Sequence, residues 1–326
     1  MFQSGQYSRR RLLRAGAAAL AGAPSLARAA TGTLLPQPSP LPKVENVQGA
    51  ADAQNRLTVA AYINQKGPFQ FVVDTGADRS VIADDVAKSL GLRNGDDMIV
   101  QGIARAVPAQ SVELDSLRMD RVTIESLPMP VLPRSWLGAD GYFGLDVIDR
   151  QAVTFDFQNH SLSIRPSDRM TDILPVADEA LVRVNGSNGR LTAVNCSVDG
   201  VKAYAFIDSG AQISIGNSHL FAALAEAHGT KYLNDEVIQL LGVTGGAASG
   251  RLVAIKSIKL GSVRFANSVL VISDLPVFEI WELDQKPALF IGMNFLRQTS
   301  AITIDYGRKE LRFKLAQAQT RLASRV

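Results

Sequence analysis

The chain has 326 residues, a formal net charge of +3 and one cysteine, Cys196. A single cysteine excludes an intramolecular disulfide framework, so stability must come from packed cores, and this length is enough for two of them. Residues 1–29 hold five arginines and no acidic residue, which leaves the rest of the chain at −2. No Lys/Arg cluster remains there that would bind nucleic acid or an anionic membrane surface.

The N-terminal segment, residues 1–29, reads as a targeting signal. Arg9 and Arg10 open a basic stretch, and a short Ala- and Gly-rich apolar run over 15–23 follows it. That run is too short to span a bilayer, and Ala27-Arg28-Ala29 fits a small-x-small cleavage site. The pattern predicts twin-arginine-type export, with a periplasmic protein as the product. A basic disordered tail is the alternative. Residues 30–48 contain closely spaced prolines and predict an extended linker.

Two short motifs stand at the ends of apolar runs. The run 69–73 and the run 204–207 are each followed by aspartate, a hydroxyl residue, glycine and alanine: Asp74-Thr75-Gly76-Ala77 and Asp208-Ser209-Gly210-Ala211. An aspartate that ends a buried strand is costly unless it has a function. Two carboxyl groups held close together cannot both ionise, so they share one proton and can serve as acid and base.

The surroundings of these motifs repeat in the same order. A glycine motif follows at 142–148 in the first half and at 289–296 in the second. Each is followed by alternating residues with a polar turn, at 153–164 and at 302–313, which predicts a β-hairpin. Short helices are expected at 84–90 and 219–228. The order predicts an internal duplication in a mainly β chain.

Each half also carries a glycine-bearing turn, and the second turn is flanked by apolar strands. The first turn covers 101–104 and the second 242–250; their candidate substrate-covering residues are Gly102, Ile103, Gly242, Val243, Gly245 and Gly246. The second turn lacks the Gly-Lys-Ser/Thr ending of a phosphate-binding loop, which excludes nucleotide binding there. An ordinary glycine-rich loop is the alternative.

These motifs resemble those of retropepsin-like aspartic proteases. The resemblance covers about 50–315 and rests on the paired Asp-[Thr/Ser]-Gly-Ala motifs and the paired glycine motifs. It implies a mainly β fold of two homologous β-barrel lobes with an active-site cleft between them. The implied lobes are 49–166 and 180–316, with an interlobe linker at 167–179 and a tail at 317–326.

The resemblance also implies roles for the motif residues. Asp74 and Asp208 are the expected catalytic dyad. Thr75 and Ser209 brace the two loops, Gly76 and Gly210 allow close packing, and the glycine turns close over the substrate as flaps. The implied function is an aspartic endopeptidase that acts on peptides or proteins as a monomer, with no cofactor or metal. A catalytically inactive peptide-binding module and a structural envelope protein are the alternatives.

Other conspicuous residues have simpler explanations. Trp136 and Trp281 precede the two glycine motifs and are expected in core or rim packing rather than in a substrate subsite. Cys196 lies in an apolar run and is expected to be a small buried side chain. The three histidines lie in a hairpin turn and on a polar helix without metal-ligand spacing, so we expect them to be solvated.

Overall fold

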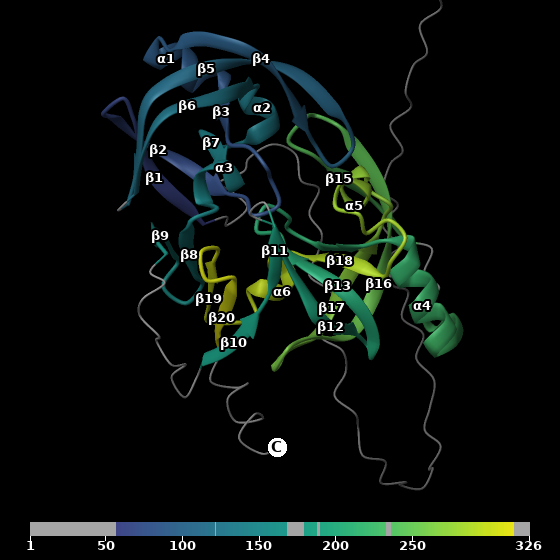
Figure 1. Cartoon of the computed structure of the whole chain (residues 1–326). Helices are drawn as coiled ribbons and strands as arrows, with labels where there is room; N and C mark the ends of the chain where they lie inside the picture. The colour runs from purple at the N-terminus through teal and green to yellow at the C-terminus, as the bar shows by residue number, and fades with distance from the viewer. Residues whose placement is uncertain (1–56, 121, 168–178, 188–189, 233–235, 316–326) are drawn as a thin grey trace, which may run out of the picture. The chain divides into compact units, whose positions relative to one another are not determined.

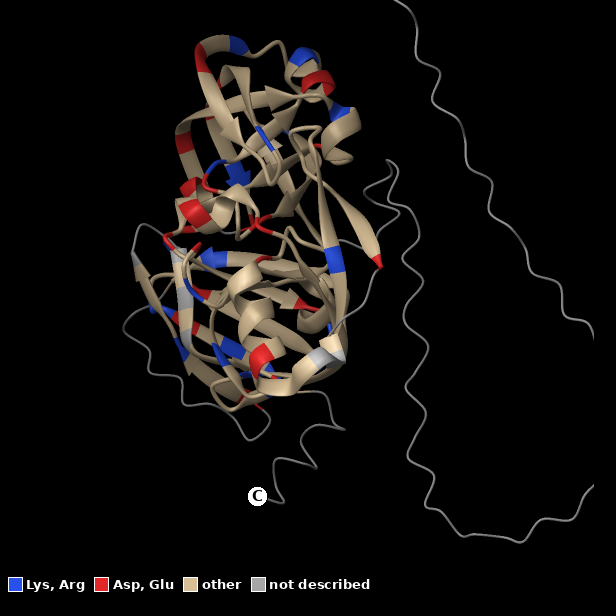
Figure 2. Cartoon of the chain, turned by 90° about the vertical axis from the view of Figure 1, so that its right-hand side faces the viewer, with Lys and Arg blue, Asp and Glu red and all other residues tan. Residues whose placement is uncertain are grey.

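A computed structural model describes residues 57–120, 122–167, 179–187, 190–232 and 236–315. The signal and linker predicted over 1–48, most of the interlobe segment 167–179 and the tail 317–326 therefore lie outside the described residues. The described chain is mainly β, with a few short helices (Figure 1). Figure 2 shows Lys and Arg interspersed with Asp and Glu along the ribbon of this part. No helix among the described residues is long and apolar enough to cross a membrane.

The first half forms a closed barrel of six strands. Their order is β1-β2-β7-β3-β6-β5, and pairing of β1 with β5 closes the ring, while β4 extends it. The strands are β1 (Thr58–Ile63), β2 (Lys66–Val73), β3 (Val81–Ala83), β4 (Arg93–Gln101), β5 (Ala106–Met119), β6 (Val122–Leu132) and β7 (Gly141–Phe143). The helices α1 (Asp84–Leu90) and α2 (Arg134–Leu137) follow β3 and β6.

The second half repeats this barrel. The ring order is β12-β13-β18-β14-β17-β16, closed by pairing of β12 with β16, while β11 and β15 extend it. The strands are β11 (Asn185–Ser187), β12 (Arg190–Val198), β13 (Val201–Ile207), β14 (Ser214–Gly216), β15 (Val237–Leu241), β16 (Ala247–Leu260), β17 (Val263–Ile272) and β18 (Ala288–Ile291). The helices are α4 (Ser218–His228), the 3₁₀ helix η2 (Gly229–Tyr232) and α5 (Pro276–Ile280). The prediction of two β-barrel lobes is confirmed.

A third sheet joins the two halves. Its order is β10-β20-β19-β8-β9, built from β8 (Gln151–Asp156), β9 (Ser161–Pro166), β10 (Glu179–Arg183), β19 (Ala301–Asp305) and β20 (Glu310–Lys314). Both hairpins expected from the sequence are present, but β8 of the first half pairs with β19 of the second. The hydroxyls of Thr154 and Thr303 lie 2.8 Å apart across this pairing. The hairpins therefore hold the halves together in one sheet.

Buried aromatic side chains anchor the two motif strands, β2 and β13, in the walls of their barrels. Phe71 on β2 stacks on Phe143 of β7 with ring centroids 4.4 Å apart, and both side chains are fully buried. In the second half Phe206 on β13 lies beside Phe290 on β18. Parallel pairing of β2 with β7, and of β13 with β18, places the end of each motif strand next to a glycine motif.

Both helices expected from the sequence are present with small differences, whereas the short helices α2 and α5 were not expected. Helix α1 covers 84–90 as expected and ends at Gly91 in the left-handed conformation. Helix α4 begins one residue earlier than expected because Asn217 caps it, accepting a hydrogen bond from the Leu220 N–H. The second glycine turn is shorter than the expected 242–250, since β16 already begins at Ala247.

Candidate active site

Asp74 and Asp208 occupy matching positions in the two halves. Asp74 follows β2 and its backbone N–H donates to the Phe143 carbonyl over 2.9 Å. Asp208 follows β13 and donates in the same way to the Ile291 carbonyl over 3.0 Å. Each aspartate is therefore fixed at the end of a buried strand by the strand of the neighbouring glycine motif.

Thr75 and Ser209 connect the two halves by four hydrogen bonds. The Thr75 N–H donates to Ser209 Oγ over 3.2 Å, and the Ser209 N–H donates to Thr75 Oγ1 over 3.0 Å. Each hydroxyl donates in turn to a backbone carbonyl of the opposite half, at Ile207 (2.8 Å) and Val73 (2.7 Å). Both side chains are only 4 % exposed, so these bonds lie out of competition with water. The brace expected from the sequence is present.

Gly76 and Gly210 make room for the carboxyl group of the opposite half. Each donates its N–H to Oδ1 of its own aspartate over 2.9 Å. A Cβ on Gly76 would lie 2.8 Å from Cγ of Asp208, and a Cβ on Gly210 would overlap Cγ of Asp74. Any larger residue at either position would therefore displace a carboxyl group. The structure thus brings Asp74 and Asp208 together across the junction of the halves.

The electrostatics favour one shared proton. Burial raises the pKa of the Asp208 carboxyl well above its ordinary value, and the charge of Asp74 and a hydrogen bond between the two carboxyls raise it further. The N–H groups of Gly210 and Ala211, which donate to Asp208, oppose this rise without cancelling it. The pair therefore keeps a proton at pH values where an isolated aspartate is ionised.

A second pair of matched bonds supports the site from behind. Asp146 of α3 (Leu145–Ile148) accepts from the N–H of Ser80 (2.9 Å) and from its hydroxyl (2.6 Å), and Ser80 Oγ accepts from the N–H of Gly144. Asn294 of α6 (Met293–Leu296), Ser214 and Gly292 repeat these contacts. Asp146 and Asn294 are therefore structural, and each holds a serine rather than capping its own helix.

Tyr306 is a neighbour of the dyad that the sequence analysis missed. It follows β19, is buried, and hydrogen-bonds to Thr75. Burial and the charges of Asp74 and Asp208 raise the pKa of its phenol far above the ordinary range. The signal was the change from Phe157 in the first hairpin to Tyr306 in the second, which adds a hydroxyl at the matched position.

The two glycine turns contact each other, which the sequence did not predict. The first turn joins β4 to β5 and holds Gly102 and Ile103; the second joins β15 to β16 and holds Gly242, Val243, Gly245 and Gly246. A Cβ on Gly242 would lie 2.8 Å from Cγ1 of Ile103. Arg105 and Thr244, which the sequence analysis did not single out, exchange hydrogen bonds between the turns.

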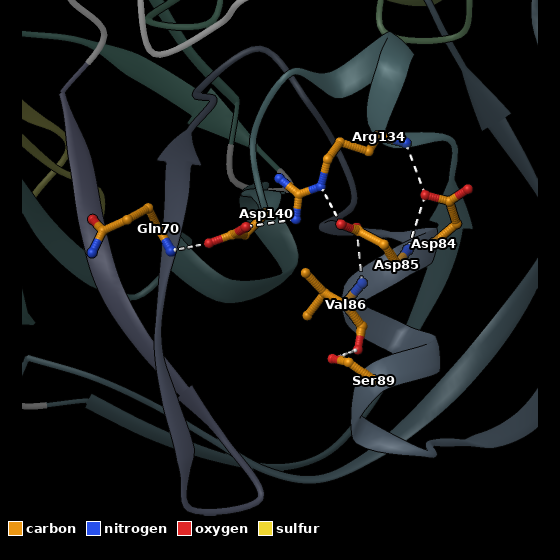
Figure 3. A network of polar contacts seen from close by, with 7 residues as sticks. All are labelled: Gln70, Asp84, Asp85, Val86, Ser89, Arg134 and Asp140. Carbon is orange, nitrogen blue, oxygen red and sulfur yellow. Dashed lines mark hydrogen bonds and ion pairs between the residues drawn. The ribbon is translucent and has the colours of Figure 1, made fainter.

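The two tryptophans have different surroundings. Trp281 packs edge-on against Phe206 with ring centroids 4.0 Å apart, as expected for core packing. Trp136 on α2 is 38 % exposed and faces Gly245 of the second turn. Figure 3 shows how α2 is held: Arg134 pairs with Asp85 of α1 and with Asp140, and Asp140 also accepts from the Gln70 N–H.

The remaining candidates agree with the simple explanations. Cys196 is buried, and burial raises the pKa of its thiol to about 12, which makes it a poor nucleophile. His160 and His219 are exposed, and exposed His228 contacts the Asp199 carbonyl and Tyr232. Within the described ranges no three His, Cys, Asp or Glu residues lie close enough to hold a metal ion.

Two barrels that each contribute an Asp-[Thr/Ser]-Gly turn to one close, half-buried carboxyl pair define an aspartic-protease type of fold and site. The sequence model of the aspartyl protease family matches the chain at 59–147 and again at 194–295, which together cover more than half of it. The chain therefore belongs to the retropepsin-like aspartyl protease family, with one matched region in each barrel. A search of curated proteins found no match to the chain.

The shared proton predicts an unusual pH dependence of stability. Because the pKa of Asp208 is higher in the folded than in the unfolded chain, the folded state binds more protons, and the free energy of unfolding falls as pH rises above about 4. Asp208→Asn removes this group, so we expect the variant to be more stable than the wild type at pH 7 and to lose less stability between pH 5 and pH 7. Urea unfolding at both pH values measures this. Asp115→Asn, at an exposed ion pair, is the control and should leave the slope unchanged. An identical slope in wild type and Asp208→Asn would contradict the raised pKa.

Proposed function

We propose that the chain is an aspartic endopeptidase that hydrolyses peptide bonds of peptide or protein substrates with Asp74 and Asp208. The observation that carries the proposal is the close, half-buried carboxyl pair, in which each half supplies one aspartate and partial desolvation favours a shared proton. The family match supports proteolysis as the class of reaction. The mechanism needs only water and the two carboxyl groups, so no cofactor is proposed.

In the proposed reaction the ionised carboxyl of the pair takes a proton from water while the water oxygen bonds to the scissile carbonyl carbon. The protonated carboxyl donates its proton to the carbonyl oxygen, which gives a tetrahedral gem-diol. The C–N bond then breaks as one carboxyl returns a proton to the leaving nitrogen and the other accepts a proton from a gem-diol hydroxyl. One proton remains on the pair, ready for the next cycle.

An inactive peptide-binding module is the second candidate. Both aspartates, both bracing hydroxyls and both glycines are intact, which favours activity, because a module that only binds peptide has no need of a close carboxyl pair that shares a proton. The only support for a structural envelope protein was the Pro-rich segment within 30–48, which lies outside the described residues.

The dyad proposal predicts the kinetics of three variants. Asp74→Asn and Asp208→Asn should each lower the turnover of a peptide library by roughly 10³-fold or more, and the double variant should be scarcely worse than either, because the two groups act as one unit. Circular dichroism should show all three folded. A single variant that kept more than about a tenth of the wild-type rate would contradict the dyad.

We also propose that one chain is sufficient for activity, since each copy contains both aspartates. Specific activity should then stay constant on dilution, and sedimentation of the active protein should show a single chain. Activity that falls with dilution would instead indicate that the halves pair between chains.

The alanines after the two motifs predict the pH range of activity. Ala77 and Ala211 carry no hydroxyl that could donate to the carboxyl groups and favour the ionised form, so the pKa values of the dyad should stay high. We expect a bell-shaped pH–rate profile centred at roughly pH 4 to 6. Replacing both alanines by serine should move the acid limb to lower pH. An optimum below about pH 3, or no shift in the double variant, would contradict this explanation.

We further propose export to the periplasm through the twin-arginine pattern in residues 1–29. Fractionation of cells that express the full chain tests this proposal. Arg9→Lys combined with Arg10→Lys should leave the protein in the cytoplasm, whereas unchanged export of this variant would argue against the signal.

A further inference from the structure

Strand β19 of the third sheet leads directly to a buried phenol beside the dyad. Ile304 and Tyr306 stand two positions apart, so their buried side chains share one face of the strand. The Tyr306 N–H donates to the Gln151 carbonyl over 3.0 Å, which continues the pairing of β19 with β8. Burial and the charges of Asp74 and Asp208 raise the pKa of the phenol, so its hydroxyl lies within electrostatic reach of both carboxyl groups. Tyr306 therefore connects the third sheet to the dyad.

The hydroxyl of Tyr306 hydrogen-bonds to that of Thr75, and the other contacts of Thr75 give the direction of this bond. Thr75 Oγ1 gives its single proton to the Ile207 carbonyl over 2.8 Å and accepts from the Ser209 N–H over 3.0 Å. The phenol must therefore be the donor, and it occupies the second acceptor position of the Thr75 oxygen. The hydrogen bonds then run from Tyr306 through Thr75 to the residue before Asp208, which crosses between the halves twice.

This bond departs from the two-fold symmetry of the brace. The four bonds made by Thr75 and Ser209 are related in pairs, one member from each half. At the position that matches Tyr306 the first half has Phe157, which has no hydroxyl to offer Ser209. Phe157 is half-buried and stacks on Phe155, with ring centroids 6.4 Å apart. The third sheet thus supports the Thr75 side of the brace with a donor that the matched phenylalanine lacks.

The turn that follows the phenol is held in place, unlike the matched turn of the first half. Asp305 is buried and accepts from the Ser167 hydroxyl and from the N–H of Arg308. Glu310 is also buried and accepts from the Arg308 guanidinium over 3.1 Å. In the first half the turn residues 158–160 are all exposed. These contacts fix the backbone on both sides of the phenol.

The hydroxyl that the phenol contacts fixes the loop that carries Asp74. With its proton given to a carbonyl and both lone pairs occupied, Thr75 Oγ1 has a single orientation that satisfies all three partners. Thr75 follows Asp74 directly, and the Gly76 N–H donates to the same carboxyl group. Because adjacent carboxyl groups repel one another unless they share a proton, loops that carry them must be fixed if the groups are to stay close.

We propose that Tyr306 is a positioning residue, which donates to Thr75 and thereby keeps the two carboxyl groups close enough to share a proton. The phenol reaches the brace from the third sheet, so this sheet sets the geometry of the dyad as well as joining the halves. The role is indirect, because Tyr306 acts through Thr75. Its kinetic consequence rests on the proposed peptidase function.

Tyr306→Phe removes the hydroxyl, keeps the ring and tests this role. On one peptide substrate we expect kcat to fall roughly tenfold while KM stays within about twofold of the wild-type value, because misplaced carboxyl groups slow the chemical step without changing contacts to bound peptide. Circular dichroism at the assay temperature should show that the variant is folded.

Tyr232→Phe is the matched control. Tyr232 is a buried tyrosine of the same half, and its hydroxyl donates to the Asp199 carboxylate over 2.6 Å. Asp199 precedes β13 and Asp208 follows it, so the length of this seven-residue strand, about 23 Å, separates the control from the dyad. Both variants lose a phenol hydrogen bond and should lose stability. In the control, however, kcat should stay within about twofold of the wild-type value.

A second measurement does not depend on turnover. Carbon-13 NMR of aspartate-labelled protein follows the titration of the dyad, and the gap between its two steps reports how strongly the carboxyl groups interact. In Tyr306→Phe the gap should narrow by roughly half a pH unit or more, because carboxyl groups that lie farther apart interact less. Tyr232→Phe should leave the gap unchanged.

An unchanged kcat or an unchanged gap in Tyr306→Phe would each overturn the positioning role. An equal fall of kcat in Tyr306→Phe and Tyr232→Phe would also overturn it, because the loss would then follow from weakened structure in general. If the wild type cleaves no peptide, the peptidase proposal fails instead, and the gap between the titration steps decides by itself whether Tyr306 positions the pair.

Discussion

The close approach of two carboxyl groups is the constraint on which the rest of this structure depends. Bringing Asp74 and Asp208 together in a partly desolvated site is unfavourable both by desolvation and by repulsion, and a shared proton relieves the repulsion only while the groups stay in contact. The buried strands β2 and β13, the brace of Thr75 and Ser209 and the absence of a Cβ at Gly76 and Gly210 all serve that approach. The fold supplies the free energy that holds an unfavourable pair in place.

The duplication gives the site a two-fold character, and the departures from it are informative. The brace uses threonine in one half and serine in the other, with the same four bonds. Behind the dyad, the carboxylate of Asp146 in the first half accepts a hydrogen bond from a serine hydroxyl, and the amide oxygen of Asn294 accepts the matching bond in the second half. Tyr306 replaces Phe157 and gives the second half a phenol near the carboxyl pair. These differences give the two aspartates unequal surroundings.

Much of the architecture could be predicted because its signals are local. A run of apolar residues that ends in Asp-[Thr/Ser]-Gly marks both the strand and the loop after it, and repetition of the motif places the two aspartates in equivalent positions. The contacts between distant segments carried no such signal. Pairing of β8 with β19 depends on how the halves meet, and either hairpin would look the same without it. The contact of Arg105 with Thr244 could likewise not be predicted from either turn alone. Glycines of the two turns are required because side chains of the opposite turn lie against them, and the sequence does not show that the turns meet.

The most direct test of the central claim is to observe the two carboxyl groups as they titrate. Carbon-13 NMR of aspartate-labelled protein should show Asp74 and Asp208 titrating as a coupled pair in two well-separated steps, the upper one far above the range of an ordinary aspartate. In Asp74→Asn the step that remains should move to lower pH, because the neighbouring charge that raised it is gone. Two independent titrations in the ordinary range, with Asp208 unaffected by the substitution at Asp74, would contradict the shared-proton account.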